Sequence, residues 1–109
     1  MKLLANGANV NTKDKDGWTA LIYAAMDGHA DMAKELLANG AKVNTKNNIG
    51  RSALMYAAQG DYADVVNVLL KNGADINKKD KTGWTALSLA KNKNHKEMVH
   101  LLKKAGATK

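Results

Sequence analysis

An internal repeat of 33 residues constrains this chain more than any other feature of its sequence. The triplet Asn6-Gly7-Ala8 returns as Asn39-Gly40-Ala41 and Asn72-Gly73-Ala74, and in weakened form as Ala105-Gly106-Ala107. Glycine and leucine columns recur at the same spacing, and residues 14–46 match residues 47–79 at nearly half of their positions. A period of this length, kept without an insertion, predicts a stack of units that pack mainly on their neighbours.

The residues of one unit predict two short helices followed by an extended loop. Thr19 supplies a hydroxyl that can start the first helix, and Asn39-Gly40 ends the second. Neither helix is long enough to be stable alone, so each must bury its apolar face on the next unit. In the first unit we expect a polar turn (14–17), a helix (20–25), a second helix (29–38, with Met32, Ala33, Leu36 and Leu37 at helical spacing) and an extended finger (41–46), with helices recurring over 52–58, 62–71, 85–90 and 95–104.

This unit resembles the ankyrin repeat, because G-x-T-A-L-x-x-A-A and L-L-x-N-G-A recur together at the period of that family. The resemblance covers essentially the whole chain. It implies an all-α fold, an α-solenoid of helix-turn-helix units joined by extended finger turns. The unequal repeats and the G-W-T-A-L motif look more like natural bacterial ankyrin proteins than like a consensus design.

The chain departs from the family's T-P-L-H motif. The proline is replaced by Ala20, Ala53 and Ala86, and the histidine by Ile22, Met55 and Ser88. In the family this histidine helps to link neighbouring repeats by hydrogen bonds, so its loss calls those links, but not the fold, into question.

The repeat register predicts the domain organisation. A remnant of a preceding repeat is expected over 1–13, ankyrin repeats over 14–46 and 47–79, and a C-terminal capping repeat over 80–109. Lys91 and Lys103 stand where earlier repeats carry apolar residues, as the wet outer face of a terminal repeat requires.

The beginning of the chain looks like a cut end of a longer array. The apolar side of the first repeat, drawn from Leu21, Met32 and Leu36, would be covered at best by residues 1–5. We therefore expect the end formed by residues 1–46 to be the less stable one and prone to self-association.

Composition narrows the function classes. The absence of cysteine excludes disulfides, thiolate zinc sites and thiol nucleophiles. No apolar run approaches the roughly 18 residues of a membrane span, and no signal peptide precedes the repeats, so a soluble chain is expected, with the cytoplasm favoured over other compartments. No catalytic set, phosphate loop or cofactor motif stands out, which predicts a protein that is not an enzyme.

The resemblance also indicates where a partner would bind. Positions matching Trp18, Arg51 and Trp84 line the concave face in ankyrin proteins, and tryptophan and arginine are enriched at binding hot spots. Units that stack about 8–10 Å apart would place Arg51 between the two indoles. In the alternative interpretation, the rings only cover turn glycines and pack on neighbouring fingers.

Two further groups of exposed positions correspond to partner contacts in the family, although for any single residue a plain solvated turn is the favoured interpretation. The finger-tip group is Lys13, Lys15, Asp16, Lys46, Asn48, Ile49, Lys79, Lys81 and Thr82. The group between the helices of each unit is Met26, Asp27, Gln59, Gly60, Asn92 and Lys93.

Three other columns favour structural roles. His29 and His95 share a column with Tyr62, and the spacing of His95 and His100 does not place both on one helix face, so metal binding is not expected. Asn11, Asn44 and Asn77 match a position that is hydroxylated in some animal ankyrin proteins. We interpret them instead as holding their own turns by side-chain hydrogen bonds.

The sequence therefore favours a protein-binding module that uses the concave face and the finger tips, with the partner unidentified. One alternative is binding of nucleic acid or an anionic surface through residues 71–109, which carry the whole excess of the net charge of +7. Another is a structural spacer.

Overall fold

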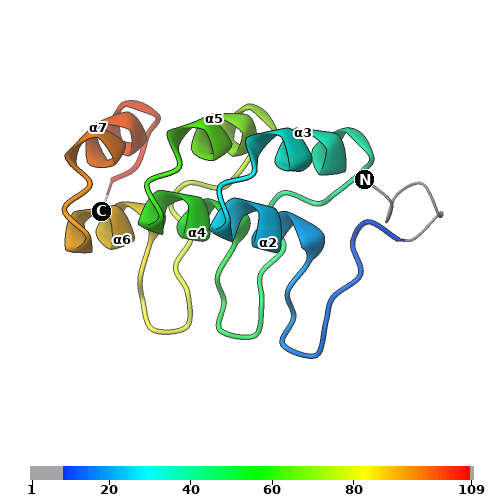
Figure 1. Ribbon diagram of the computed structural model, residues 1–109. Coiled ribbons are helices and arrows are strands. Elements are labelled where there is room, and N and C mark those ends of the chain that lie inside the picture. Colours follow the sequence, from blue (N-terminus) through cyan, green and yellow to red (C-terminus); the bar gives the residue numbers. More distant parts are fainter. Residues whose placement is uncertain (1–8, 109) are drawn as a thin grey trace.

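A computed structural model describes residues 9–108 of the chain as a stack of helix pairs (Figure 1). No strand occurs in this range, where a single antiparallel bridge joins Lys46 to Ser52. None of the helices described there is long and apolar enough to cross a membrane. The six helices of this range are α2 (Ala20–Met26), α3 (Ala30–Ala38), α4 (Ala53–Gln59), α5 (Ala63–Lys71), α6 (Ala86–Asn92) and α7 (Lys96–Lys104).

The helices form two rows, and long loops project from one side of the stack. The inner helices α2, α4 and α6 lie next to the projecting loops, and the outer helices α3, α5 and α7 lie behind them (Figure 1). Each inner helix contacts the next one, α2 with α4 and α4 with α6, while α3 contacts α5. The expected all-α solenoid of helix-turn-helix units is confirmed.

Local sequence explains where the inner helices start. The Thr19 hydroxyl accepts a hydrogen bond from the Ile22 N–H at 3.3 Å, as the N-cap of α2. Thr85 caps α6 more completely, because the Ser88 side chain reciprocates in a capping box. Ser52 occupies the same N-cap position before α4, without a side-chain cap bond.

Each outer helix starts directly after a residue whose backbone N–H bonds to the inner helix of the same repeat. The backbone N–H groups of His29, Tyr62 and His95, the N-cap residues, donate to carbonyls of α2, α4 and α6, with the first of these bonds, to Ala24 O, at 2.9 Å. The helices are therefore one residue shorter at this end than the sequence pattern suggested.

The core runs along the stack between the two rows. Leu21, Leu54 and Leu87 occupy one repeat column and are each at most 2% exposed. Burial of one such side chain stabilises the fold by about 2 kcal/mol. Alanines fill the neighbouring positions and let adjacent inner helices approach closely, which suits a sequence without phenylalanine.

Finger asparagines link successive repeats. The amide group of Asn44 donates to Gly73 O at 3.2 Å, and its oxygen accepts from the Asp75 N–H at 2.7 Å. Asn11 and Asn77 make the equivalent pairs of bonds, each to the repeat that follows. The prediction that these side chains hold their own turns was therefore wrong, because both amide atoms reach about thirty residues ahead in the chain.

The first repeat agrees in part with the expectation of a poorly covered apolar side. Leu21 and Leu36 are buried, but Met32 is 37% exposed, whereas Val65 and Met98 at the same position of the next two repeats are at most 1% exposed. Residues 1–5, which were expected to cover this repeat, and most of the remnant over 1–13 lie outside the described residues. Self-association at this end stays a prediction.

Candidate functional site

One side chain organises the turn at the tip of each finger. Asp14 Oδ1 accepts hydrogen bonds from the N–H groups of Asp16 and Trp18, both at 2.9 Å. Asn47 and Asp80 do the same for the second and third turns. The repeated turns fix the backbone from which Trp18, Arg51 and Trp84 project.

In the first two repeats, the second oxygen or the amide of this turn residue meets a tyrosine at the same position of its own repeat. The Tyr23 hydroxyl donates to Asp14 Oδ2 at 2.5 Å, and the Asn47 amide donates to the Tyr56 hydroxyl at 2.9 Å. The hydrogen bond from Tyr23, followed by that from the Trp18 N–H, holds the pKa of Asp14 below its ordinary value. The same bond raises the pKa of Tyr23.

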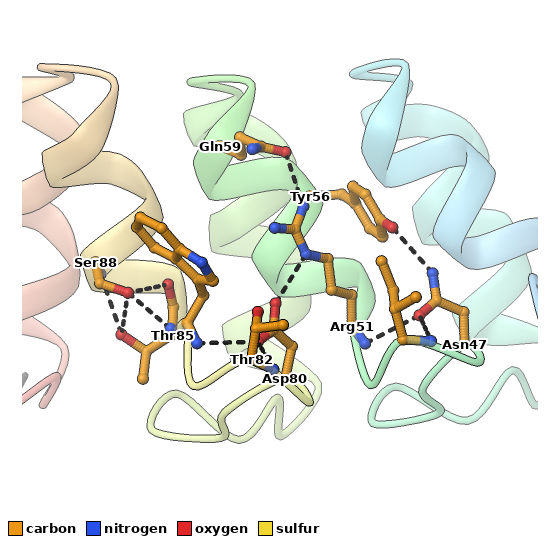
Figure 2. A network of polar contacts seen from close by, with 10 residues as sticks. Asn47, Arg51, Tyr56, Gln59, Asp80, Thr82, Thr85 and Ser88 are labelled. Atoms are coloured by element: carbon orange, nitrogen blue, oxygen red, sulfur yellow. Dashed lines mark hydrogen bonds and ion pairs between the residues drawn. The ribbon is translucent and has the colours of Figure 1, made fainter.

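The third repeat replaces this tyrosine by Leu89, and the partner comes from the preceding repeat instead. Arg51 Nε donates to Asp80 Oδ2 at 3.0 Å, and its Nη1 donates to Gln59 Oε1 at 3.3 Å. Figure 2 shows the guanidinium held between these two side chains. The pair is nearly dry, with 16% of the Arg51 side chain and 3% of the Asp80 side chain exposed.

Asp80 is ionised in this setting despite its burial. Burial raises the pKa of the carboxyl, but the hydrogen bonds from the Trp84 N–H, from Arg51 and from Thr82 outweigh it. The net pKa lies below the ordinary value, so at neutral pH Asp80 is an anion that neutralises Arg51.

Aromatic rings continue this arrangement toward the first repeat. The Trp18 ring lies 4.9 Å from the Tyr23 ring and 4.7 Å from the Tyr56 ring, and Arg51 Cζ lies 5.5 Å above the Tyr56 ring. The Tyr56 ring therefore contacts both the Trp18 ring and the Arg51 guanidinium, and the placement of Arg51 between the two indoles stays a prediction. The ring of Tyr56 was not foreseen, because the sequence pattern suggested only a buried helix position.

The residues predicted to meet a partner differ in exposure. Trp18, Arg51, Trp84 and Gln59 are half-buried, and Arg51 and Gln59 are also engaged with each other. The rest are exposed, namely Lys15, Asp16, Met26, Asp27, Lys46, Asn48, Ile49, Lys79, Lys81, Thr82, Asn92 and Lys93.

Backbone hydrogen bonds join the finger tips into one edge. The Asn48 N–H donates to Asp16 O and the Lys81 N–H donates to Ile49 O, both at 3.0 Å. The Asn48 amide adds a bond to Lys15 O at 3.2 Å. The structure thus brings the predicted finger-tip residues of three repeats onto one continuous edge. We call this edge, together with the loop-facing ends of the inner helices, the concave face.

The histidine column has a structural role in the third repeat. His95 Nε2 lies 2.9 Å from the Gln59 carbonyl oxygen, and Nδ1 lies 3.8 Å from Asp61 Oδ2. In the second repeat, Tyr62 of the same column packs over Gly28. His95 and Tyr62 therefore each contact the preceding repeat. His29, the member of this column in the first repeat, is exposed.

Comparison with family models agrees with this architecture. A model of ankyrin repeats in three copies matches residues 1–80, and a second, of ankyrin repeats in many copies, matches residues 61–103. The chain belongs to the ankyrin repeat family. Ankyrin repeats are generally protein–protein interaction modules rather than enzymes. No curated protein matches the chain.

Aligning the three repeats could have revealed the contacts between repeats that sequence reasoning missed. Positions 23, 56 and 89 are Tyr, Tyr and Leu, and positions 14, 47 and 80 are Asp, Asn and Asp. In the third repeat, Leu89 replaces the tyrosine that would bind the turn residue Asp80. The repeat before it carries Arg51 where the other two repeats carry tryptophan. That coincidence is the signal for the ion pair of Arg51 with Asp80.

Proposed function

We propose that this chain is a non-enzymatic module that binds a protein partner on its concave face. The observation that carries the proposal is the continuous edge of finger tips, which presents exposed side chains from three successive repeats on a backbone fixed by hydrogen bonds. Its clearest feature is Ile49, a large apolar side chain that is 53% exposed at the tip of the central finger. Exposed apolar side chains in such a setting favour partner contact.

The rigid network beneath this edge supports the same function. Arg51 is neutralised by Asp80 and stacked on Tyr56, so its position does not depend on a partner. Trp18 is held by two tyrosines in the same way. A surface whose side chains are already positioned loses less conformational entropy on binding.

The rival function is binding of nucleic acid or an anionic surface through the lysines of residues 71–109. Several of these lysines, including Lys71, Lys96 and Lys103, lie on the outer helices α5 and α7, away from the finger tips. A nucleic-acid site collects its basic side chains along one footprint. We therefore expect only weak DNA binding, which collapses as salt is added.

Photocrosslinking tests the proposal. A benzophenone amino acid at Ile49 should form covalent adducts with protein in an extract of the source organism. The same amino acid at Asn67, an exposed position on the outer helix α5, is the matched control. Adducts from position 49 and not from position 67 support the concave face. Adducts from position 67 alone, or from neither position, contradict it.

A further inference from the structure

The charges on the concave face are distributed unevenly along the stack. At the first repeat, Lys13 and Lys15 are balanced by carboxylates at Asp14, Asp16 and Asp27. At the third repeat, Lys79, Lys81 and Lys93 are exposed, and the one carboxylate nearby, Asp80, is already paired with Arg51. Within residues 9–108 no carboxylate forms an ion pair with any of these three lysines. The face therefore becomes more basic from the first repeat to the third.

Exposed apolar surface is distributed in the opposite sense. Tyr23 is 43% exposed, Met26 39% and Ile49 53%, and all three belong to the first two repeats. Trp18 lies beside Tyr23 and adds a half-buried ring. Large exposed apolar side chains do not occur on the described part of the third repeat.

We infer that the concave face takes an extended protein segment with an apolar residue at one end and an acidic cluster at the other. The apolar residue would lie on Tyr23 and Met26, which both belong to α2 of the first repeat, and the acidic cluster on Lys79, Lys81 and Lys93. This inference rests on the proposed function and specifies the chemistry of the partner. Complementary charge would fix the direction in which the segment lies across the repeats.

Repeat spacing sets the distance between the two parts of the motif. Adjacent helices pack about 9 Å apart, so the first and third repeats are separated by about 18 Å. An extended chain advances about 3.4 Å per residue. The apolar residue and the acidic cluster should therefore be about five residues apart in the partner.

The test is selection from a phage-displayed library of random peptides of about twelve residues, which is long enough to span two repeats. The expected peptides carry glutamate or aspartate clustered about five positions from a leucine, methionine or aromatic residue. Enrichment of basic or neutral peptides, of acidic peptides without the spaced apolar residue, or of no peptides would overturn the inference.

Charge reversal locates the acidic end. The triple variant Lys79→Glu, Lys81→Glu, Lys93→Glu should bind a selected peptide at least about tenfold more weakly by fluorescence anisotropy. The matched variant Lys71→Glu, Lys96→Glu, Lys103→Glu makes the same change of net charge on the outer helices and should weaken binding less than about threefold. Equal losses in the two variants would overturn the inference, after circular dichroism has shown that both are folded.

Two outcomes separate this inference from the proposed function. If benzophenone at position 49 crosslinks proteins but selected peptides lack the acidic cluster, the binding function stands and the partner chemistry is wrong. If a thymidine oligonucleotide binds more tightly than any selected peptide at physiological salt, both fall in favour of the nucleic-acid alternative.

Discussion

At the scale of single residues, Arg51 ties the second repeat to the third through a nearly dry ion pair with Asp80. Replacement by methionine keeps much of the side chain's length and removes its donors, which leaves the Asp80 carboxylate with its turn hydrogen bonds alone. We predict that Arg51→Met lowers the free energy of unfolding by about 1–3 kcal/mol, as measured by urea denaturation.

The control for this variant is Lys81→Met, an exposed position on the next finger, which should change the free energy of unfolding by less than about 0.5 kcal/mol. A double-mutant cycle with Asp80→Asn isolates the pair itself. A coupling energy of zero would mean that the ion pair adds nothing to the link between the repeats.

The turn carboxylates also make stability depend on pH. The pKa values of Asp14 and Asp80 are lower in the folded chain than ordinary aspartate values, so the unfolded chain binds more protons in acid. Their contribution is complete above an unfolded pKa of about 3.9 and is lost as the pH falls through the lower folded values. The urea midpoint should be flat between about pH 7 and 5 and fall below about pH 4.

The variant Asp14→Asn, Asp80→Asn identifies the groups responsible. It should be less stable than the parent at neutral pH and should lose less of its remaining stability in acid. The same fall in both proteins would assign the acid sensitivity to other carboxylates.

At the scale of elements, asparagine bridges join each finger to the next. Asn44→Ala removes two hydrogen bonds, to Gly73 O and from the Asp75 N–H. We predict a loss of about 1–2 kcal/mol in the free energy of unfolding. Asn67→Ala, at an exposed position on α5, removes the same amide and should be neutral or slightly stabilising, because alanine favours helix. Equal changes in the free energy of unfolding at positions 44 and 67 would show that the hydrogen bonds of Asn44 between fingers do not stabilise the protein.

The turn between α2 and α3 fits closely against the next repeat. Gly28 has φ +75°, and a Cβ there would lie 2.6 Å from the Tyr62 ring. Gly73 has a similar φ of +88° but open space around it. Gly28→Ala should therefore destabilise the protein more than Gly73→Ala in thermal melts, since both carry backbone strain and only the first adds a clash.

The contribution of the ring is separable from that of the backbone. In a Tyr62→Ala background the difference between Gly28→Ala and Gly73→Ala should shrink. A difference that persists without the ring would show that backbone strain, and not the contact between repeats, sets the cost.

Much of this element-level structure follows from the sequence. The helices, their threonine caps at Thr19 and Thr85 and the finger period were predictable, because caps and apolar spacing act within a few residues of each other. The exposure of Met32 followed from the repeat register as well, because the same position is buried at Val65 and Met98, each of which follows another described repeat.

The candidate site was less predictable than the fold. The set of finger-tip positions followed from the repeat register, but the contacts beneath them did not. Arg51 meets Asp80, and His95 meets Gln59, across 29 and 36 residues respectively. Such contacts depend on how the repeats stack and on substitutions elsewhere in the chain, such as Leu89 at the position where the other repeats carry tyrosine. A pattern of neighbouring residues therefore does not predict them.

At the scale of the whole molecule, the described part of the chain is elongated, with extents of 40 × 25 × 20 Å. The stack presents two long surfaces, one formed by the finger tips and inner helices and one formed by the outer helices. The central claim is that only the first of these surfaces binds a partner protein.

Amide hydrogen exchange with and without a captured partner tests this claim most directly. The account predicts slower exchange on binding in the finger tips around Asp16, Ile49 and Thr82, with little change along α3, α5 and α7. Protection confined to the outer helices, with unchanged exchange at the finger tips, would contradict it.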